Sequence, residues 1–353
     1  MTIGALGGPI GPGVYTGDAE HDTVAGLVRV ARDAGIGADP IAVVNFYVAL
    51  KSKPLALLVG PAHSGKIALI RCFAGMLFGS DSLHCQMMVG HPWWAGRSGD
   101  VGLCTHAQTR LNTEKIWALI EDASQPENAN RLFIACLTRI SPAEVSGFFS
   151  EVAFQLQHER LMRLPGEHLV EPIPFPPNLL LIGTLDADQF DEADADLLSQ
   201  TTVIRWQAEA DLIEGSYPTP ICHAAEREFL QSRIHSEQTA CRKLHRVLGW
   251  RPQTCLPLDS AECLLTTHSV EMRKAVIGEL LIYLANAWSR SERGLLDPEP
   301  GRNLAIAFDL AVAQVLLPRI QASPRRAVVL RRQLCDMLAE GLGRAPDPAG
   351  NLS

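Results

Sequence analysis

The sequence lacks the local motifs that identify small metal and redox sites. None of its nine cysteines stands in a C-x-x-C pair, and its eleven histidines form no H-x-x-x-H or H-x-x-E-H spacing. Zinc centres and dithiol sites depend on such spacings, so the sequence predicts neither. Several cysteines lie within apolar runs, which is typical of reduced, buried thiols in a reducing cytoplasm.

Long hydrophobic runs are also missing. The longest apolar stretches, residues 54–60, 178–185 and 275–288, are too short or too interrupted to cross a bilayer. The first residues carry no basic segment followed by an apolar one, and they are dense in glycine and proline. We therefore expect residues 1–21 to form a flexible tail, and the chain to be cytoplasmic with no membrane partner.

Positive charge is in the minority, with 31 Lys and Arg against 39 Asp and Glu and a net charge of -8. Such a chain is not expected to bind nucleic acid indiscriminately, because the phosphate backbone repels it. A local basic face within residues 323–334 offers either a nucleic-acid contact or an ordinary solvated helix face, and we favour the second. Its four arginines are Arg325, Arg326, Arg331 and Arg332.

The first 210 residues contain short apolar runs that alternate with helical patterns. Five β-rich runs are apolar on both faces, as in a parallel sheet that helices cover on each side. They cover residues 55–60, 85–90, 132–137, 178–185 and 201–206. Helices are predicted before them, one over 22–36 and one that Asp39 and Pro40 begin. The predicted fold class is α/β, with a parallel five-stranded sheet in an αβα core.

Beyond about residue 210 the β-rich runs stop and helical patterns dominate, which predicts a second, all-helical unit. These patterns cover residues 223–248, 261–288, 304–320 and 325–340. The predicted organisation is a flexible tail at 1–21, N-terminal helices at 22–50, an α/β core at 51–210, a helical domain at 211–342 and a flexible tail at 343–353.

A glycine-bounded loop joins the first predicted strand of the core to a predicted helix. It matches the pattern G-x-x-x-x-G-K over Gly60, Pro61, Ala62, His63, Ser64, Gly65 and Lys66. In that context backbone N–H groups turn around phosphate oxygens, the helix N-terminus favours the anion, and Lys66 reaches the outer phosphates. The alternative is an ordinary turn with an exposed lysine. We favour the phosphate loop, because both flanking elements are those that the mechanism requires.

Ile67 departs from this pattern. The position after the lysine usually carries Ser or Thr, whose hydroxyl binds Mg²⁺, and isoleucine has no oxygen to offer. Either the loop survives as a fold element without metal-dependent chemistry, or water molecules complete the coordination shell. His63 and Ser64 are not expected to form a catalytic pair, because no orienting acid is adjacent.

Taken together, the core resembles the McrB-like group of AAA+ ATPases and GTPases, which occur in modification-dependent restriction and related defence systems. The resemblance runs from about Leu27 to Leu334, and it includes Pro92, Trp94 and Gly102, which reproduce a Pro-x-Trp followed by Gly. It rests on NFYVALKSKPLALLVGPAHSGK, VGHPWWAGRSGDVG, SPAEVSGFFSEV, PFPPNLLLIGTLDAD, VEMRKAVIGELLIYL and AIAFDLAVAQVLLPRI. The resemblance implies an AAA+ P-loop core with a helical lid, ATP or GTP as the ligand, and protein subunits of an AAA+ assembly as partners.

The resemblance also shows where this chain departs from the family. Thr138 and Arg139 stand where the family has the aspartate that orients Mg²⁺ and the glutamate that activates water. Asp186 replaces the sensor asparagine, and Gln200 lies where an arginine would reach a neighbouring subunit's phosphate. Arg273 matches the arginine of the family's lid that approaches the nucleotide. We therefore expect no catalytic residue and no bound Mg²⁺.

These departures predict that hydrolysis is lost, because phosphoryl transfer depends on charge neutralisation and a positioned water. Loss of an arginine finger alone costs about 10³ to 10⁵ in rate. The predicted function is a degenerate McrB-like AAA+ module that binds nucleotide weakly or not at all. It would serve as a non-hydrolysing subunit of a larger assembly in restriction or anti-phage defence.

Other interpretations of the same residues remain open. One is an active ATP- or GTP-hydrolysing ring motor that drives a nuclease or remodelling partner, and another is a sensor that binds nucleotide without cleaving it. For the former metal position we predict an ion pair between Arg139 and Asp186. The simpler expectation is that Arg139 points to solvent.

Overall fold

The computed structural model describes residues 17–79, 83–89, 103–142, 145–158, 161–162, 173–186, 195–210, 223–249, 273–316 and 318. Most of the first predicted tail, the whole C-terminal tail, residues 251–272 and the four arginines of residues 323–334 lie outside this part of the chain. Pro92, Trp94 and Gly102 also lie outside it. Within the described ranges, no helix has both the length and the apolar character that crossing a membrane requires.

Five parallel strands form the central sheet, which confirms the predicted α/β class and its parallel five-stranded sheet. In spatial order they are β3 (Cys85–Val89), β4 (Phe133–Thr138), β7 (Leu179–Asp186), β2 (Leu55–Gly60) and β8 (Thr201–Arg205). Every neighbouring pair is parallel. Each strand lies within one residue of a predicted β-rich run, because apolar side chains on both faces mark a strand buried on both sides.

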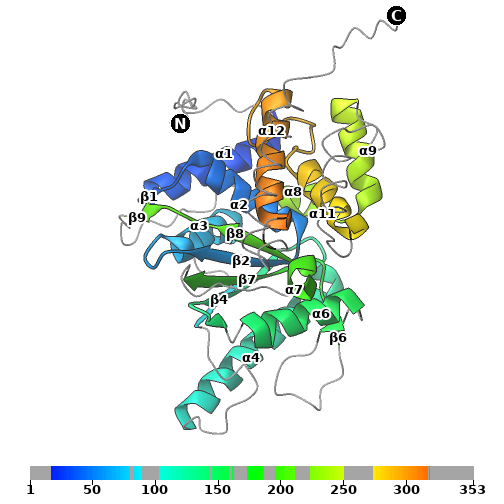
Figure 1. Cartoon of the computed structure of the whole chain (residues 1–353). Helices are drawn as coiled ribbons and strands as arrows, with labels where there is room; N and C mark the ends of the chain where they lie inside the picture. Colours follow the sequence, from blue (N-terminus) through cyan, green and yellow to red (C-terminus); the bar gives the residue numbers. More distant parts are fainter. Residues whose placement is uncertain are drawn as a thin grey trace, which may run out of the picture.

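Helices cover both faces of the sheet (Figure 1). Successive residues of β2 point to opposite faces, so Ala56 and Leu58 belong to one hydrophobic core, and Leu55, Leu57 and Val59 belong to the other. The first core is covered by α1 (Ala19–Asp33), α2 (Pro40–Ser52), α3 (Lys66–Phe78), α8 (His223–Ser232), α9 (Glu237–Leu248), α11 (Arg273–Asn286) and α12 (Pro300–Ala311). The second is covered by α4 (Leu103–Ser124), η3 (Val145–Phe149), α6 (Ser150–His158) and α7 (Ala195–Gln200).

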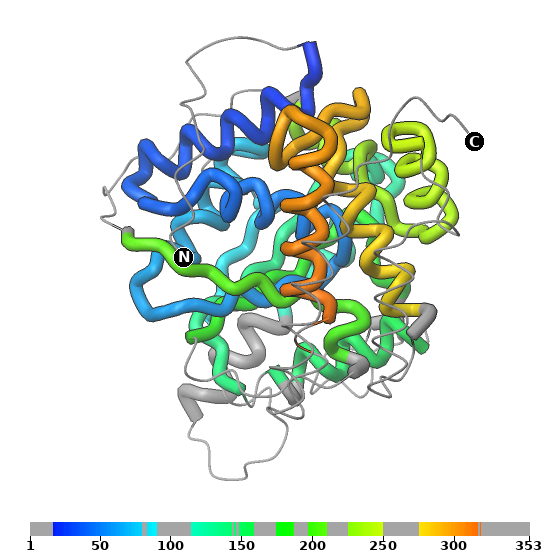
Figure 2. The backbone as a smooth tube through the Cα atoms, turned by 45° about the horizontal axis from the view of Figure 1, so that its top comes forward, coloured from blue at the N-terminus to red at the C-terminus, as the bar shows by residue number. Residues whose placement is uncertain are grey.

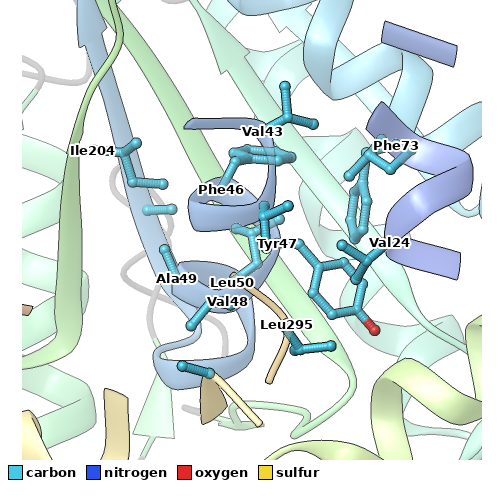
Figure 3. Close-up of a cluster of buried hydrophobic side chains, with 14 of the residues drawn as sticks. Val24, Val43, Phe46, Tyr47, Val48, Ala49, Leu50, Phe73, Ile204 and Leu295 are labelled. Atoms are coloured by element: carbon cyan, nitrogen blue, oxygen red, sulfur yellow. The ribbon is translucent and has the colours of Figure 1, made fainter. Parts of the chain in front are cut away.

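The first core contains a cluster of aromatic rings between α2, α3 and α8 (Figure 3). The ring of Phe73 packs edge-on against Phe46 at a centroid distance of 5.6 Å and against Phe229 at 5.5 Å. Tyr47 packs against Phe229 at 5.2 Å. Edge-to-face pairs add to the energy of burying the rings, so this cluster fixes α3, which follows the glycine-bounded loop, against the N-terminal helices.

Helices from the two ends of the sequence share this layer. Figure 2 shows the yellow α11 and the orange α12 beside the blue N-terminal helices, and α11 contacts α2 directly. Fully buried Glu20 of α1 forms an ion pair with Lys51 of α2, whose Nζ also donates to the carbonyl of Asn286, 3.1 Å away. The second carboxylate oxygen of Glu20 accepts from the backbone N–H of Arg290 at 2.9 Å. The described C-terminal helices are thus joined to the N-terminal ones by polar contacts inside one core.

Capping side chains explain where several helices begin. α1 starts at Ala19, three residues before the predicted start, because the Asp18 side chain accepts hydrogen bonds from the N–H groups of Glu20 and His21. α2 begins as predicted, with Asp39 at the cap and Pro40 in the first turn. α12 begins at Pro300 instead of residue 304, because the Glu299 side chain caps it, and it continues into the π-helix η6 (Val312–Leu316).

The prediction of one helix over 223–248 is wrong. The structure has α8 and α9 instead, separated by four non-helical residues. Ile234 lies in this break, and its N–H and carbonyl both bond to the side chain of Asn286 at 3.0 Å. Ser236 then caps α9 by accepting from Thr239 N. The contact with the side-chain amide of Asn286, which is distant in the sequence, therefore replaces the helical hydrogen bonds at this position.

Short elements complete the described chain. β1 (Ile36–Gly37) pairs with β9 (Glu209–Ala210), and β5 (Leu161–Met162) pairs with β6 (Ile173–Pro174), both antiparallel. One 3₁₀ turn, η2 (Pro126–Asn128), precedes β4. The β1–β9 pair joins the chain before α2 to the chain after β8.

Candidate functional site

The glycine-bounded loop lies at the carboxyl edge of the sheet, directly after β2, which pairs with β7 on one side and β8 on the other. It leads into α3 on one face, whereas α7, which follows β7 in the described chain, packs on the opposite face. In open parallel sheets, ligands bind where the connections of neighbouring strands leave toward opposite faces. The loop therefore occupies the position at which this fold favours a ligand.

Left-handed backbone conformations shape the loop. Gly65 has φ +78° and caps α3, and His63 has φ +60° although it is not a glycine. Alternation of this kind turns backbone N–H groups toward one concavity, the arrangement that holds anions. The buried Ser64 hydroxyl has no hydrogen-bond partner within the described structure. The loop thus contains a polar group that an additional ligand could satisfy.

Trp206 supports the loop from the neighbouring strand, and sequence reasoning missed it. Its backbone N–H donates to Val59 O and its indole Nε1 donates to Ser64 O, both at 2.7 Å. A Cβ atom at Gly60 would lie 2.0 Å from the carbonyl oxygen of Trp206, so only glycine fits there. The only signal in the sequence is that a buried indole N–H needs an acceptor.

Lys66 is turned back onto its own loop. Its Nζ donates to Gly60 O at 2.7 Å and to Pro61 O at 2.6 Å, and it forms an ion pair with Asp186 Oδ1 at 3.2 Å. An ammonium group has three donors, and these three acceptors occupy them. The Lys66 side chain is 8% exposed and that of Asp186 is 42% exposed. A phosphate that binds Lys66 must therefore displace one of these three acceptors, of which the Asp186 carboxylate is the most distant.

The predicted ion pair between Arg139 and Asp186 is wrong. Asp186 pairs with Lys66, and Arg139 forms no ion pair with any described residue. Arg139 is exposed directly after β4, with φ +57°, and its N–H donates to Thr184 Oγ1 at 2.9 Å. The left-handed turn takes the chain out of the strand at this residue, while Lys66 supplies a buried ammonium to Asp186.

A cavity of about 300 Å³ lies beside the start of α3. It is lined by Ile67 and Arg71 from α3, residues 87–89 from β3, and Thr138 and Arg139. The structure therefore brings together three of the positions at which the sequence departs from the family. The Thr138 hydroxyl is occupied, because it donates to Met88 O at 3.1 Å.

The residues around this cavity do not fit a resident Mg²⁺. Mg²⁺ is usually held by one or two carboxylates together with water and substrate phosphates, and none of the described residues that line this cavity is an Asp or Glu. In the described ranges, no group of three or more His, Cys, Asp or Glu residues could hold a metal ion. Ile67 and Arg139 supply an apolar group and a positive charge instead.

The structure places Gln200 and Arg273 away from the loop. A second cavity, of about 410 Å³, is lined by Gln200 and by Ala275 and Glu279 of α11. Glu279 forms an ion pair of 2.6 Å with Lys53, which precedes β2. α11 therefore begins at the amino edge of the sheet, and the six residues of β2 separate that edge from the loop by roughly 20 Å. Neither residue is brought together with Lys66.

The thiols near the first cavity are not suited to nucleophilic chemistry. Burial raises the pKa of Cys85 to about 12 and that of Cys72 to about 11, and it raises the pKa of Cys136 further above its usual value. These thiols stay protonated near neutral pH, and the thiolate is the reactive form. Cys72, Cys85 and Cys136 are also free of disulfides, as the sequence predicts.

Comparison with protein-family models and with curated proteins finds no match for this chain. The resemblance to the McrB-like group stays a prediction from the sequence. Functional inference must therefore start from the loop, the ion pair of Lys66 and the cavity beside α3.

Proposed function

We propose that this chain is a degenerate AAA+ module of the McrB-like kind, in which loop 60–66 holds nucleotide phosphates weakly and no hydrolysis follows. The observation that carries the proposal is the cavity beside the loop, where Ile67, Thr138 and Arg139 stand together and none of the described lining residues is an Asp or Glu. A parallel sheet with the loop at its carboxyl edge supports the phosphate-binding half of the proposal.

The lack of hydrolysis follows from the groups available at this edge of the sheet. Phosphoryl transfer depends on a cation that neutralises the developing charge and on a residue that orients the attacking water. Thr138 donates its hydroxyl to a backbone carbonyl, and Asp186 is engaged by Lys66. The Thr138 hydroxyl proton and one Asp186 carboxylate oxygen are thus already engaged within the protein.

Weak affinity follows from the contacts of Lys66. In the structure its ammonium is satisfied by two loop carbonyls and by Asp186. Phosphate oxygens would replace the carboxylate rather than meet an unpaired cation, and the displaced negative charge would remain close to the phosphates. The net gain from Lys66 is therefore smaller than in a loop without Asp186.

The role as a subunit of a larger assembly, and its setting in restriction or anti-phage defence, derive from the sequence resemblance. The buried contacts between the N-terminal and C-terminal helices are compatible with an architectural role, because they make a rigid body of the described helices. Size-exclusion chromatography with light scattering, with and without nucleotide, measures whether the chain assembles.

A phosphate-release assay over ATP and GTP tests the absence of hydrolysis. We expect release at the background rate with Mg²⁺, and no difference between the natural chain and Lys66→Ala. Release that Lys66→Ala abolishes would instead support the active ring motor.

A further inference from the structure

Among its described lining residues, the cavity beside the start of α3 has positive side chains and no negative ones. Arg71 and Arg139 line it together with Ile67 and Thr138. We propose that the Arg139 guanidinium replaces the divalent cation, so that the site binds the phosphates of a nucleotide as a metal-free anion. The inference rests on the proposed function, because it specifies the form in which the same site takes its ligand.

The cavity and the loop form one continuous region. Ile67 follows Lys66 directly, so both belong to the first turn of α3. Ile67 and Arg71 are four residues apart and therefore lie on the same face of that helix, which is the face that lines the cavity. A phosphate chain that begins at Lys66 can therefore continue along this face into the cavity.

Strand β7 positions the backbone of Arg139 and the ammonium group of Lys66 at the same edge of the sheet. Arg139 N bonds to Thr184 Oγ1 at 2.9 Å, and Lys66 Nζ bonds to Asp186 Oδ1 at 3.2 Å. Thr184 and Asp186 are two residues apart on this strand, or roughly 7 Å. The Arg139 side chain therefore starts close enough to Lys66 for one short polyphosphate chain to contact both residues.

Arg139 is suited to replace a cation. Its guanidinium keeps its charge at any physiological pH and offers paired donors to phosphate oxygens. The residue is exposed and forms no ion pair within the described structure, so its charge does not have to be released from a carboxylate. Mg²⁺ would bind the same phosphate oxygens. We therefore expect Mg²⁺ to compete with Arg139 instead of assisting it.

Backbone conformation and an unsatisfied donor give independent support. Three non-glycine residues of the described chain have positive φ, and two of them, His63 and Arg139, flank this site. Such conformations are disfavoured for ordinary side chains and cluster where ligands bind. The buried, unpartnered Ser64 hydroxyl lies in the same loop and would gain a partner from a bound phosphate.

An equilibrium titration of the full chain with fluorescently labelled ATP and GTP tests the inference. Each titration is made in EDTA and in excess Mg²⁺. We expect saturable binding in EDTA that Mg²⁺ does not strengthen, and at least a tenfold loss of affinity in Arg139→Asn. Asparagine tolerates the left-handed backbone and removes the charge. The matched control is Arg242→Gln on α9, whose exposed arginine bonds only within its own helix among the contacts described, and it should bind as the natural chain does.

Competition experiments and a second variant show which part of the nucleotide and which property of Arg139 provide the affinity. Unlabelled pyrophosphate should displace the nucleotide, whereas adenosine and guanosine should not, and Arg139→Lys should retain part of the affinity. The inference is overturned by binding that requires Mg²⁺, by equal affinity in a folded Arg139→Asn variant, by displacement with nucleosides alone, or by no saturable binding. Thermal unfolding of each variant verifies folding. Phosphate release with Mg²⁺ would contradict the proposed function, whereas the role of Arg139 is judged by the titration in EDTA.

Discussion

The two ends of strand β2 satisfy their positive charges in different ways. Before the strand, Lys51 is fully buried and pairs with Glu20, and Lys53 pairs with Glu279 at 2.6 Å. After the strand, Lys66 pairs with a carboxylate that is 42% exposed. Arg139, which follows β4 at the same edge of the sheet, forms no ion pair with any described residue. The two lysines that precede β2 are thus paired with carboxylates, whereas Arg139 at the carboxyl edge of the sheet has no described carboxylate partner.

The amino end has the contacts of a structural centre. Lys51 also donates to Asn286 O, and Lys53 also donates to Leu198 O at 2.6 Å, so both lysines connect segments far apart in the sequence. Buried ion pairs are retained only when further hydrogen bonds satisfy their groups. The comparison indicates that mutations at the amino end should change stability, and that mutations at the carboxyl end should change anion binding.

Removal of one partner of the buried pair should have the largest effect. Lys51→Ala leaves the Glu20 carboxylate buried without its ammonium partner, which typically costs about 3–5 kcal/mol. Urea unfolding followed by circular dichroism measures the loss. A loss of less than about 1 kcal/mol in the free energy of unfolding, as expected for an exposed ion pair, would contradict a structural role of the Lys51–Glu20 pair.

Gly60→Ala should be the most damaging change at the carboxyl end. The added Cβ would lie 2.0 Å from Trp206 O, so the loop or β8 must shift, and overpacking of this kind costs about 1–3 kcal/mol. Anion binding should be lost with it. Gly26→Ala on α1 is the matched control. The Cβ atom added there would lie 3.5 Å from its nearest neighbour, Met76 Sδ, which is an ordinary van der Waals contact. A Gly60→Ala variant as stable as this control would contradict the tight packing of the loop on Trp206.

Lys243 makes the stability of the protein depend on pH. Burial lowers its pKa to about 7, and its Nζ donates to Trp288 O at 2.7 Å. Above that pH the unfolded chain binds more protons at this lysine than the folded chain does, so this group makes stability rise with pH. We expect a rise of about 2 kcal/mol between pH 7 and about pH 9 relative to Lys243→Met. Parallel pH dependences of the two proteins would exclude this effect.

Asp186→Asn should have the smallest effect on stability and the opposite effect on binding. The pair with Lys66 is partly exposed and contributes at most about 1 kcal/mol to folding. Without the carboxylate, phosphate meets Lys66 with less competition, and we expect affinity in EDTA to rise about three- to tenfold. Titration with labelled nucleotide measures the change, and a weaker affinity would show that Asp186 assists binding instead of opposing it.

The sequence predicts the elements of the fold better than their side-chain partners. The five strands are predictable because each is a short run that is apolar on both faces, and the loop is predictable because its glycines and lysine have fixed spacing. Trp206, the pairing of Lys66 with Asp186 and the break at Ile234 were missed. Each depends on residues far apart along the chain, and local pattern contains no information about which of them meet.

The positions that depend on the family resemblance lie at two edges of the sheet. Ile67, Thr138 and Arg139 line one cavity beside the loop. Gln200 and the start of α11, which carries Arg273, lie at the opposite edge of the sheet. The order of the strands in the sheet brings Ile67, Thr138 and Arg139 together. The position of α11 depends instead on how the C-terminal helices pack, and amphipathic patterns in the sequence do not determine that packing.

Nucleotide binding with and without Mg²⁺ tests most directly whether Arg139 has replaced the divalent cation. Labelled ATP or GTP should bind the full chain saturably in EDTA, and addition of Mg²⁺ should leave that affinity unchanged or lower it. Binding that appears only when Mg²⁺ is added would show that this edge of the sheet still holds a metal ion, and would contradict the assignment.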